Sequence, residues 1–335
     1  MTPPANPRIF AETGTLPQTD AARVDVAMCL LGKPYQSSLS VLSLLRYSGQ
    51  HINSIYMHFE PTGSRFDALP PYFLAQYLGE KARVFQPQEW LKRQAYDPAR
   101  LDDIAYRHAI RYQTAFEHSA SSHLFIMHND VLIKKDIIGA MLDAMGDAFV
   151  IGSLGQCWNC PASKEELTQA AGIGPACKPD TYHLFRPSPT QLAALYTEAV
   201  RQGFPARPYW EGWATHYDTV AWPLPECRVN EWGCLVNMAL ARPLSAPLGP
   251  VPPFGVFEEC GSINLDTAVA WFRECNRKGL RARNFAIASY LTHWVGNNKM
   301  TPRKYALAED NAKSIISTHF PQFVEWCKNN QPGLF

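Results

Sequence analysis

A short polar sequence near the middle of the chain has residue types that could bind a metal ion. His128, Asn129 and Asp130 come directly after the apolar run 123–127. A carboxylate at the carboxyl end of a strand, beside a turn, is a hard oxygen ligand with an open face. Such a ligand suits Mg²⁺ or Mn²⁺, which proteins bind through one or two carboxylates together with substrate phosphates. The alternative is that Asp130 only caps the turn that follows the strand.

The segments around this sequence predict an alternation of strands and helices. Apolar runs predict strands over 24–31, 52–59, 82–85, 123–127 and 148–154. Helical spacing predicts a helix capped by Ser37 or Ser38 and ended by Gly49, one that starts at Asp97 and continues to Phe116, and one over 137–145. This order is typical of a mainly parallel α/β sheet with helices on both faces, and such sheets bind ligands at the carboxyl ends of their strands.

The second half of the chain is a less regular C-terminal extension. Its spacing predicts helices over 187–203, 230–241, 266–278 and 302–331. We divide the chain into a flexible leader, an α/β half, a cysteine-containing insertion, a second half and a helical tail, over 1–22, 23–155, 156–180, 181–300 and 301–335.

The composition excludes several classes of protein. The 335 residues include 46% hydrophobic and 18% charged residues, which is enough apolar material for a core, and the net charge is only +1. We therefore expect no nucleic-acid partner, because no sequence-wide field attracts polyanions. No apolar stretch is long enough for a transmembrane helix, and the first residues do not resemble a secretory signal. With nine cysteines and no signal, we expect a cytoplasmic protein whose thiols are reduced or bind metal.

Over 24–143 the chain resembles the inverting nucleotide-sugar glycosyltransferases of the GT-A fold, in the large family-2-like group. The first strand followed by Tyr35 and Gln36 is similar to the family's strand and Tyr-Asn pair. The segment 111–130 is similar in spacing to the family's helix, strand and DxD motif, with Gln113 where Asn is common and His128 where the first Asp is expected.

This resemblance implies a set of donor-binding residues. Asp130 would bind the metal that bridges the donor's diphosphate, and His128 would contact the ribose or the metal. Tyr35 and Gln113 match positions of the family's donor site. Glu60, just past the second strand, is a candidate for the nucleoside contact, with an exposed loop acid as the alternative.

Two later segments also resemble the family. The segment 229–233 looks like the Glu-Asp sequence at a helix start that supplies the catalytic base, which implies that Glu231 takes the acceptor proton. Asp218 is the competing base and Glu211 a weaker one, and the alternative for Glu231 is a charge interacting with the helix dipole.

The second of these segments, 291–298, resembles the family's late histidine segment. It implies that His293 meets the metal or the diphosphate, with Lys299 near the phosphates; a packed core histidine is the alternative.

The resemblance implies metal-dependent, inverting transfer of a sugar from a nucleoside diphosphate to a glycan, lipid-linked or other hydroxyl acceptor. The half 23–155 would bind the donor, and 181–300 the acceptor. A nucleotidyltransferase that makes the sugar nucleotide is one alternative, but it prefers a Gly-rich basic loop where this chain has only Gly32 and Lys33. A non-catalytic sugar-nucleotide- or glycan-binding protein on the same scaffold is the other, because His128 replaces an acid.

The cysteine-containing insertion has the spacing of a possible structural zinc site. Cys157 and Cys160 form a CxxC pair, and Cys177 follows after a spacer. Thiolates from such a pair can share one tetrahedral Zn²⁺. The fourth ligand is left open among Cys227, Cys234, Cys260 and His183. The alternatives are unlinked reduced cysteines in a loop and, less in keeping with the position of the pair, a thioredoxin-like redox pair.

Overall fold

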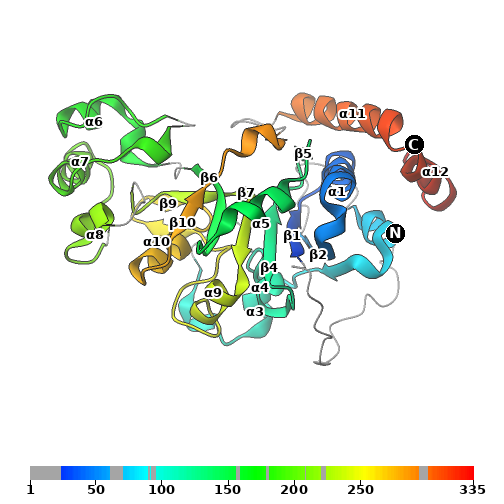
Figure 1. Cartoon of the computed structure of the whole chain (residues 1–335), viewed down its shortest axis with the longest axis horizontal. Helices are drawn as coiled ribbons and strands as arrows, with labels where there is room; N and C mark the ends of the chain where they lie inside the picture. The colour runs from blue at the N-terminus through cyan, green and yellow to red at the C-terminus, as the bar shows by residue number, and fades with distance from the viewer. Residues whose placement is uncertain are drawn as a thin grey trace.

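The computed structural model describes residues 24–60, 71–89, 91, 96–155, 159–178, 181–207, 209–219, 224–293 and 301–335. Within these ranges, seven strands form one sheet in the order β10–β6–β7–β4–β1–β2–β3 (Figure 1). Their bounds are Val24–Leu30 (β1), Ile52–Phe59 (β2), Ala82–Phe85 (β3), His123–Met127 (β4), Val150–Gly155 (β6), Arg228–Asn237 (β7) and Ala282–Asn284 (β10).

The sheet is mainly parallel. The strand β1 pairs in parallel with β2 and β4. The strand β2 pairs in parallel with β3, and β10 pairs in parallel with β6. The strand β7 runs antiparallel to both of its neighbours, β4 and β6. Two antiparallel pairs lie outside the sheet, β5 (Val131–Ile133) with β11 (Leu291–His293) and β8 (Glu258–Cys260) with β9 (Ile263–Leu265).

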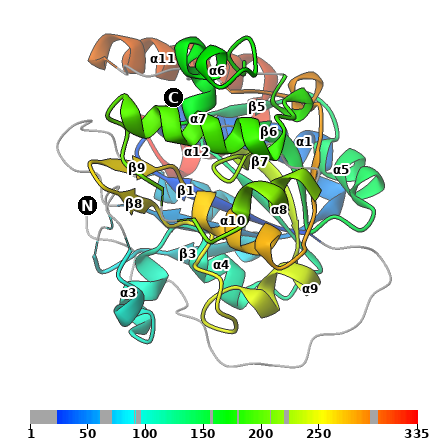
Figure 2. The ribbon, with the colours of Figure 1, turned by 90° about the vertical axis from the view of Figure 1, so that its left-hand side faces the viewer.

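Helices cover both faces of this sheet, which confirms the predicted α/β class. Their bounds are Pro34–Ser48 (α1), Tyr72–Leu78 (α2), Ile104–Ala109 (α3), Gln113–His118 (α4), Ile137–Met145 (α5), Glu165–Ala170 (α6), Pro189–Arg201 (α7), Trp213–Thr219 (α8), Met238–Ala241 (α9), Val269–Arg277 (α10), Pro302–His319 (α11) and Pro321–Asn330 (α12). The helices α6, α7 and α8 lie at one end of the molecule, and α11 and α12 at the other (Figures 1 and 2).

Each face of the sheet has its own hydrophobic core, because successive side chains of a strand point to opposite faces. On β1, Val24, Val26, Met28 and Leu30 join a core with α1, α5, α11 and α12. Ala27 points the other way, into a core that includes residues of α4, α7 and α10. Because both faces are covered, the central strands are nearly continuous apolar runs, and the predicted strand positions agree closely with the structure.

The predicted helix over 230–241 is wrong. Residues 228–237 form strand β7, and only Met238–Ala241 are helical. Both faces of this strand are buried, so its apolar residues do not alternate with polar ones. A run of this kind cannot be distinguished from a buried helix by periodicity. Glu231 therefore lies on a strand and not at a helix start, so its predicted interaction with a helix dipole does not arise.

Two predicted helices differ in their bounds for a shared physical reason, a residue in the left-handed backbone conformation. Lys33 has φ 54° and precedes Pro34 in the first turn, so α1 begins before the predicted caps Ser37 and Ser38, which lie inside the helix. Tyr112 has φ 64° and separates α3 from α4, where one helix from Asp97 to Phe116 is predicted.

No helix in the described ranges has both the length and the apolar character needed to cross a membrane.

Candidate functional site

The antiparallel strand β7 brings Glu231 to the turn that follows β4. Met127, the last residue of β4, lies opposite Gly233. Because the two strands run in opposite directions, the first residues of β7 extend past the end of β4, beside His128. The small pair of β5 and β11 adds a third segment, since His293 lies opposite Val131. Segments distant in the sequence thus meet at the carboxyl end of β4.

Four predicted site residues contact one another there. The Nε2 atom of His293 lies 3.1 Å from Oδ1 of Asp130 and 3.3 Å from Nδ1 of His128. On its other side, Nε2 of His128 lies 3.4 Å from Oε1 of Glu231. The ring of His293 also stacks on Trp232, with the ring centroids 5.3 Å apart and an interplanar angle of 7°. We call His128, Asp130, His293 and Glu231 the strand-end cluster.

Three members of the cluster have the chemistry of a metal site. One nitrogen each of His128 and His293 and one carboxylate oxygen of Asp130 lie within 4.8 Å of one another. Asp130 is buried, and the two imidazoles are half-buried, which leaves an open side for a substrate. Imidazole nitrogen is softer than the oxygen ligands that Mg²⁺ requires, so the mixed set suits Mn²⁺ better. The residues fit a divalent cation.

Lys33 is a site residue that the sequence analysis did not identify. Its ammonium Nζ donates a hydrogen bond to Oδ2 of Asp130 over 2.6 Å. Burial alone would raise the pKa of Asp130, but the Lys33 ammonium and the hydrogen bond to His293 outweigh it and hold that pKa well below its usual range. The strand-end cluster therefore contains an ionised carboxylate that already pairs with one positive charge, the ammonium of Lys33.

Glu231 is fixed by a second, buried ion-pair network. Arg228, on the same strand, donates one hydrogen bond to Oε2 of Glu231 and another to Oδ2 of Asp266, the latter over 2.5 Å. Burial would raise the pKa of Glu231, but the Arg228 guanidinium and His128 act against it and keep that pKa below its ordinary value. Glu231 is thus a charged acceptor that points its other oxygen at His128.

Serine side chains of α1 hold the turn that carries Asp130. Ser37 Oγ accepts a hydrogen bond of 3.0 Å from the amide of Asn129. Ser40 Oγ donates to the carbonyl of Val131 over 2.7 Å and accepts from the amide N–H of the same residue over 3.1 Å. Ser43 Oγ accepts from the amide of Ile133 over 3.1 Å. Three serines spaced three residues apart share one helix face, so α1 fixes both β5 and the turn before it.

Glu60 has a different environment from the exposed loop that was its alternative. It is buried at the end of β2 and forms a two-pronged ion pair with Arg111, with an Nε–Oε1 distance of 2.5 Å and an Nη2–Oε2 distance of 3.0 Å.

Tyr35 and Gln113 have partners outside the strand-end cluster. The hydroxyl of Tyr35 donates to the carbonyl of Leu334, and its ring packs edge-on against Phe335. The amide of Gln113 donates to Oε1 of Glu117 and to the carbonyl of Ala246, each over 2.8 Å. These contacts join Tyr35 and Gln113 to other parts of the fold and not to the strand-end cluster.

Several predicted residues lie outside what the structure describes. These are Cys157, Lys299 and the side chains of Asp218 and His183. Cys160 and Cys177 are buried, and within the described ranges neither belongs to a group of three potential metal ligands. The zinc site therefore stays a prediction. Glu211 is exposed in the turn before α8.

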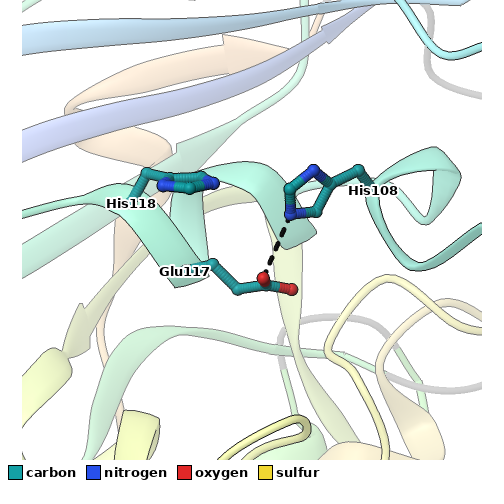
Figure 3. Close-up of side chains that lie close together, drawn as sticks. All are labelled: His108, Glu117 and His118. Atoms are coloured by element: carbon teal, nitrogen blue, oxygen red, sulfur yellow. Dashed lines mark hydrogen bonds and ion pairs between the residues drawn. The ribbon is translucent and has the colours of Figure 1, made fainter. Parts of the chain in front are cut away.

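A second group of metal-capable side chains is satisfied without an ion. His108, Glu117 and His118 converge at the facing ends of α3 and α4 (Figure 3). Arg107 donates to both carboxylate oxygens of Glu117, over 2.7 and 3.0 Å. Gln113 and His108 donate to one oxygen each, over 2.8 and 3.0 Å. Four donors fill the acceptor positions of this carboxylate, so the group is an ion-pair cluster that joins α3 to α4.

The sequence matches no protein-family model and no curated protein. Among solved structures, the chain is similar to a mannosyltransferase from Pyrobaculum calidifontis in complex with GDP-Man and Mn²⁺, with a TM-score of 0.43 and 10% identity over 93% of this chain and 81% of that one. The chain is also similar to glucosyl-3-phosphoglycerate synthase from Mycobacterium tuberculosis in complex with Mn²⁺, UDP-glucose and phosphoglyceric acid. For this structure the TM-score is 0.38 and the identity 9%, over 88% of this chain and 79% of that one.

A third structure, core-mannan synthase A from Aspergillus fumigatus in its Mn/GDP form, gives a TM-score of 0.36 and 11% identity over 94% of this chain and 93% of that one. All three TM-scores are below 0.5, so we infer the function from this chain's own residues.

Proposed function

We propose that this protein is a metal-dependent glycosyltransferase that moves a sugar from a nucleoside diphosphate to an acceptor hydroxyl with inversion. The observation that carries the proposal is the strand-end cluster. A carboxylate and two imidazoles from β4's end and from β11 converge at the carboxyl edge of a mainly parallel sheet, where ligands of such sheets bind.

Asp130, His293 and His128 would hold the cation, and Mn²⁺ suits their donor atoms better than Mg²⁺. The cation supplies positive charge that stabilises the leaving diphosphate. The serines of α1 orient Asp130 through the backbone of the turn and of β5, and Trp232 fixes the ring of His293 by stacking. These supports matter because a misplacement of about 1 Å in such a site can cost about 10²-fold in rate.

Glu231 is our candidate for the base that takes the proton of the acceptor hydroxyl. It is ionised, and its position beside His128 puts a negative charge at the edge of the proposed metal site. Inversion requires a base on the face of the sugar opposite to the leaving diphosphate. Asp218 in α8 remains the competing candidate, and the acceptor would bind beside β7, within the half 181–300.

The experiment is a hydrolysis and transfer assay with a panel of UDP- and GDP-sugars, with and without Mn²⁺. We expect slow Mn²⁺-dependent release of nucleoside diphosphate from at least one donor, and a loss of about 10³-fold or more in Asp130→Ala. Saturable binding without turnover would favour the non-catalytic sugar-nucleotide-binding protein. Turnover of a nucleoside triphosphate and a sugar phosphate would favour the nucleotidyltransferase.

A further inference from the structure

Helix α1 begins without a cap of its own. Its N-cap residue is Lys33, whose side chain makes no capping hydrogen bond. The first amide groups of a helix need acceptors, and an anion is favoured there by the helix dipole. In this chain the acceptor comes from the C-terminal helix α11, which lies beside α1 (Figure 1). Glu309 is that acceptor.

Glu309 takes three hydrogen bonds at this helix end. Its Oε2 accepts from the backbone N–H of Tyr35 over 2.8 Å. Its Oε1 accepts from the backbone N–H of Gln36 over 3.1 Å and from the side-chain amide of Gln36 over 2.9 Å. The side chain is buried, with a residue exposure of 7%. One carboxylate, 273 positions along the chain from Gln36, therefore satisfies the start of α1.

A second residue of α11 holds Lys33 itself. The hydroxyl oxygen of Tyr305, one helical turn before Glu309, accepts a hydrogen bond of 2.9 Å from the backbone N–H of Lys33. Lys33 has φ 54° and ψ 57°, a left-handed conformation that is strained for any residue with a side chain. In this backbone conformation the side chain of Lys33 points toward Asp130, and its ammonium lies 2.6 Å from Oδ2 of that residue.

We propose that Lys33 binds the donor diphosphate, and that Glu309 and Tyr305 of α11 are the residues that position it. This inference rests on the proposed function. A lysine ammonium is a compact charge suited to phosphate oxygens. With a divalent cation bound to Asp130, the ammonium of Lys33, now paired with that carboxylate, would be available to a phosphate oxygen of the donor. The C-terminal tail thereby supports the donor site through Glu309 and Tyr305.

The positioning role is tested first by hydrogen exchange of the metal-free protein. In Glu309→Gln, the amides of Tyr35 and Gln36 should exchange at least about tenfold faster than in the wild type, while later amides of α1 keep their rates. Asp310→Asn is the matched control, because Asp310 is the next residue of α11 and is exposed. Unchanged exchange in Glu309→Gln would overturn the positioning role whatever the protein's activity is.

The binding role is tested by calorimetry with UDP and GDP in the presence of Mn²⁺. We expect Lys33→Met and Glu309→Gln to weaken nucleotide binding by about tenfold or more, as for loss of a charge-assisted hydrogen bond, and Asp310→Asn to leave it unchanged. Mn²⁺ binding without nucleotide should be kept or strengthened in Lys33→Met, because the ammonium that competes for Asp130 is gone. A general structural defect would weaken both.

Tyr305→Phe is the milder variant if Glu309→Gln does not fold, since it removes the hydroxyl that accepts from the Lys33 amide and keeps the ring. It should weaken nucleotide binding in the same direction. Wild-type binding with unchanged affinity in Lys33→Met overturns this inference alone. A wild-type protein that binds neither UDP nor GDP overturns the proposed function together with it.

Discussion

Glu231→Gln separates the proton-accepting role of Glu231 from its structural one. The substitution keeps the side-chain shape and removes the negative charge that faces His128 and Arg228. If Glu231 is the base, kcat for transfer should fall by about 10²- to 10⁴-fold. The affinity for UDP or GDP with Mn²⁺ should fall far less than kcat, because a base on the acceptor side does not contact the diphosphate and the lost charge reaches the metal site only through His128.

The structural cost of Glu231→Gln is moderate because Arg228 keeps a second carboxylate partner. Its hydrogen bond to Asp266 remains, at 2.5 Å. The loss of one charge-assisted hydrogen bond in a buried site predicts a decrease of about 1.5–3 kcal/mol in the free energy of unfolding. Urea unfolding followed by tryptophan fluorescence measures this decrease, and steady-state kinetics at saturating donor measures kcat.

Asp266→Asn is the matched control for this experiment. Asp266 binds the same guanidinium and is equally buried, so the variant should lose similar stability and keep most of kcat. The account of Glu231 fails if both variants lose kcat equally, since the loss would then come from the Arg228 network. It is reversed if Asp218→Asn abolishes transfer and Glu231→Gln does not.

Three further predictions concern stability and metal content. Ser40→Ala should lower the free energy of unfolding by about 2–3 kcal/mol, because two buried hydrogen bonds to Val131 are lost. The control is Ser314→Ala, at an exposed position of α11, and its urea unfolding should match that of the wild type. Burial opposes ionisation of Glu117, but its hydrogen bonds from His108, Arg107 and Gln113 lower its pKa from 4.5 to about 2. The contribution of Glu117 to stability is therefore complete above pH 4.5 and lost as the pH falls toward 2. In Glu117→Gln, the midpoint of urea unfolding should vary less with pH over that range than it does in the wild type. Elemental analysis of protein purified without added metal should find about one zinc per chain if Cys157, Cys160 and Cys177 bind it, and stable zinc-free protein would end that prediction.

The strand positions could be predicted because buried parallel strands have a strong local signal. The run 124–127 is apolar throughout and ends abruptly at polar residues, so both the strand and the location of Asp130 at its end follow from the sequence alone. The same signal failed for residues 228–237. This segment pairs with β4 and β6 at its two edges, and its side chains join the hydrophobic cores on both faces of the sheet. That environment is not visible in one stretch of sequence.

The candidate site could be predicted where a residue follows a clear strand, as Asp130 does, or lies in a segment that resembles the family, as His128, His293 and Glu231 do. Asp130, His128, His293 and Glu231 were identified and do meet. Lys33 was not, because its contact with Asp130 depends on a left-handed backbone conformation at a residue that is not glycine. Glu309 lies 273 positions from the helix amide that it caps, and no local pattern connects them.

The central claim is that the strand-end cluster binds the catalytic cation, and Mn²⁺ binding to Asp130→Asn tests it most directly. Electron paramagnetic resonance of free Mn²⁺, titrated with protein in the presence of UDP or GDP, measures the bound fraction without requiring turnover. The account predicts about one Mn²⁺ per wild-type chain and a loss of affinity of at least about 10²-fold in the variant, since its neutral amide is isosteric but a far weaker ligand. Equal Mn²⁺ affinity in the wild type and in Asp130→Asn would contradict it.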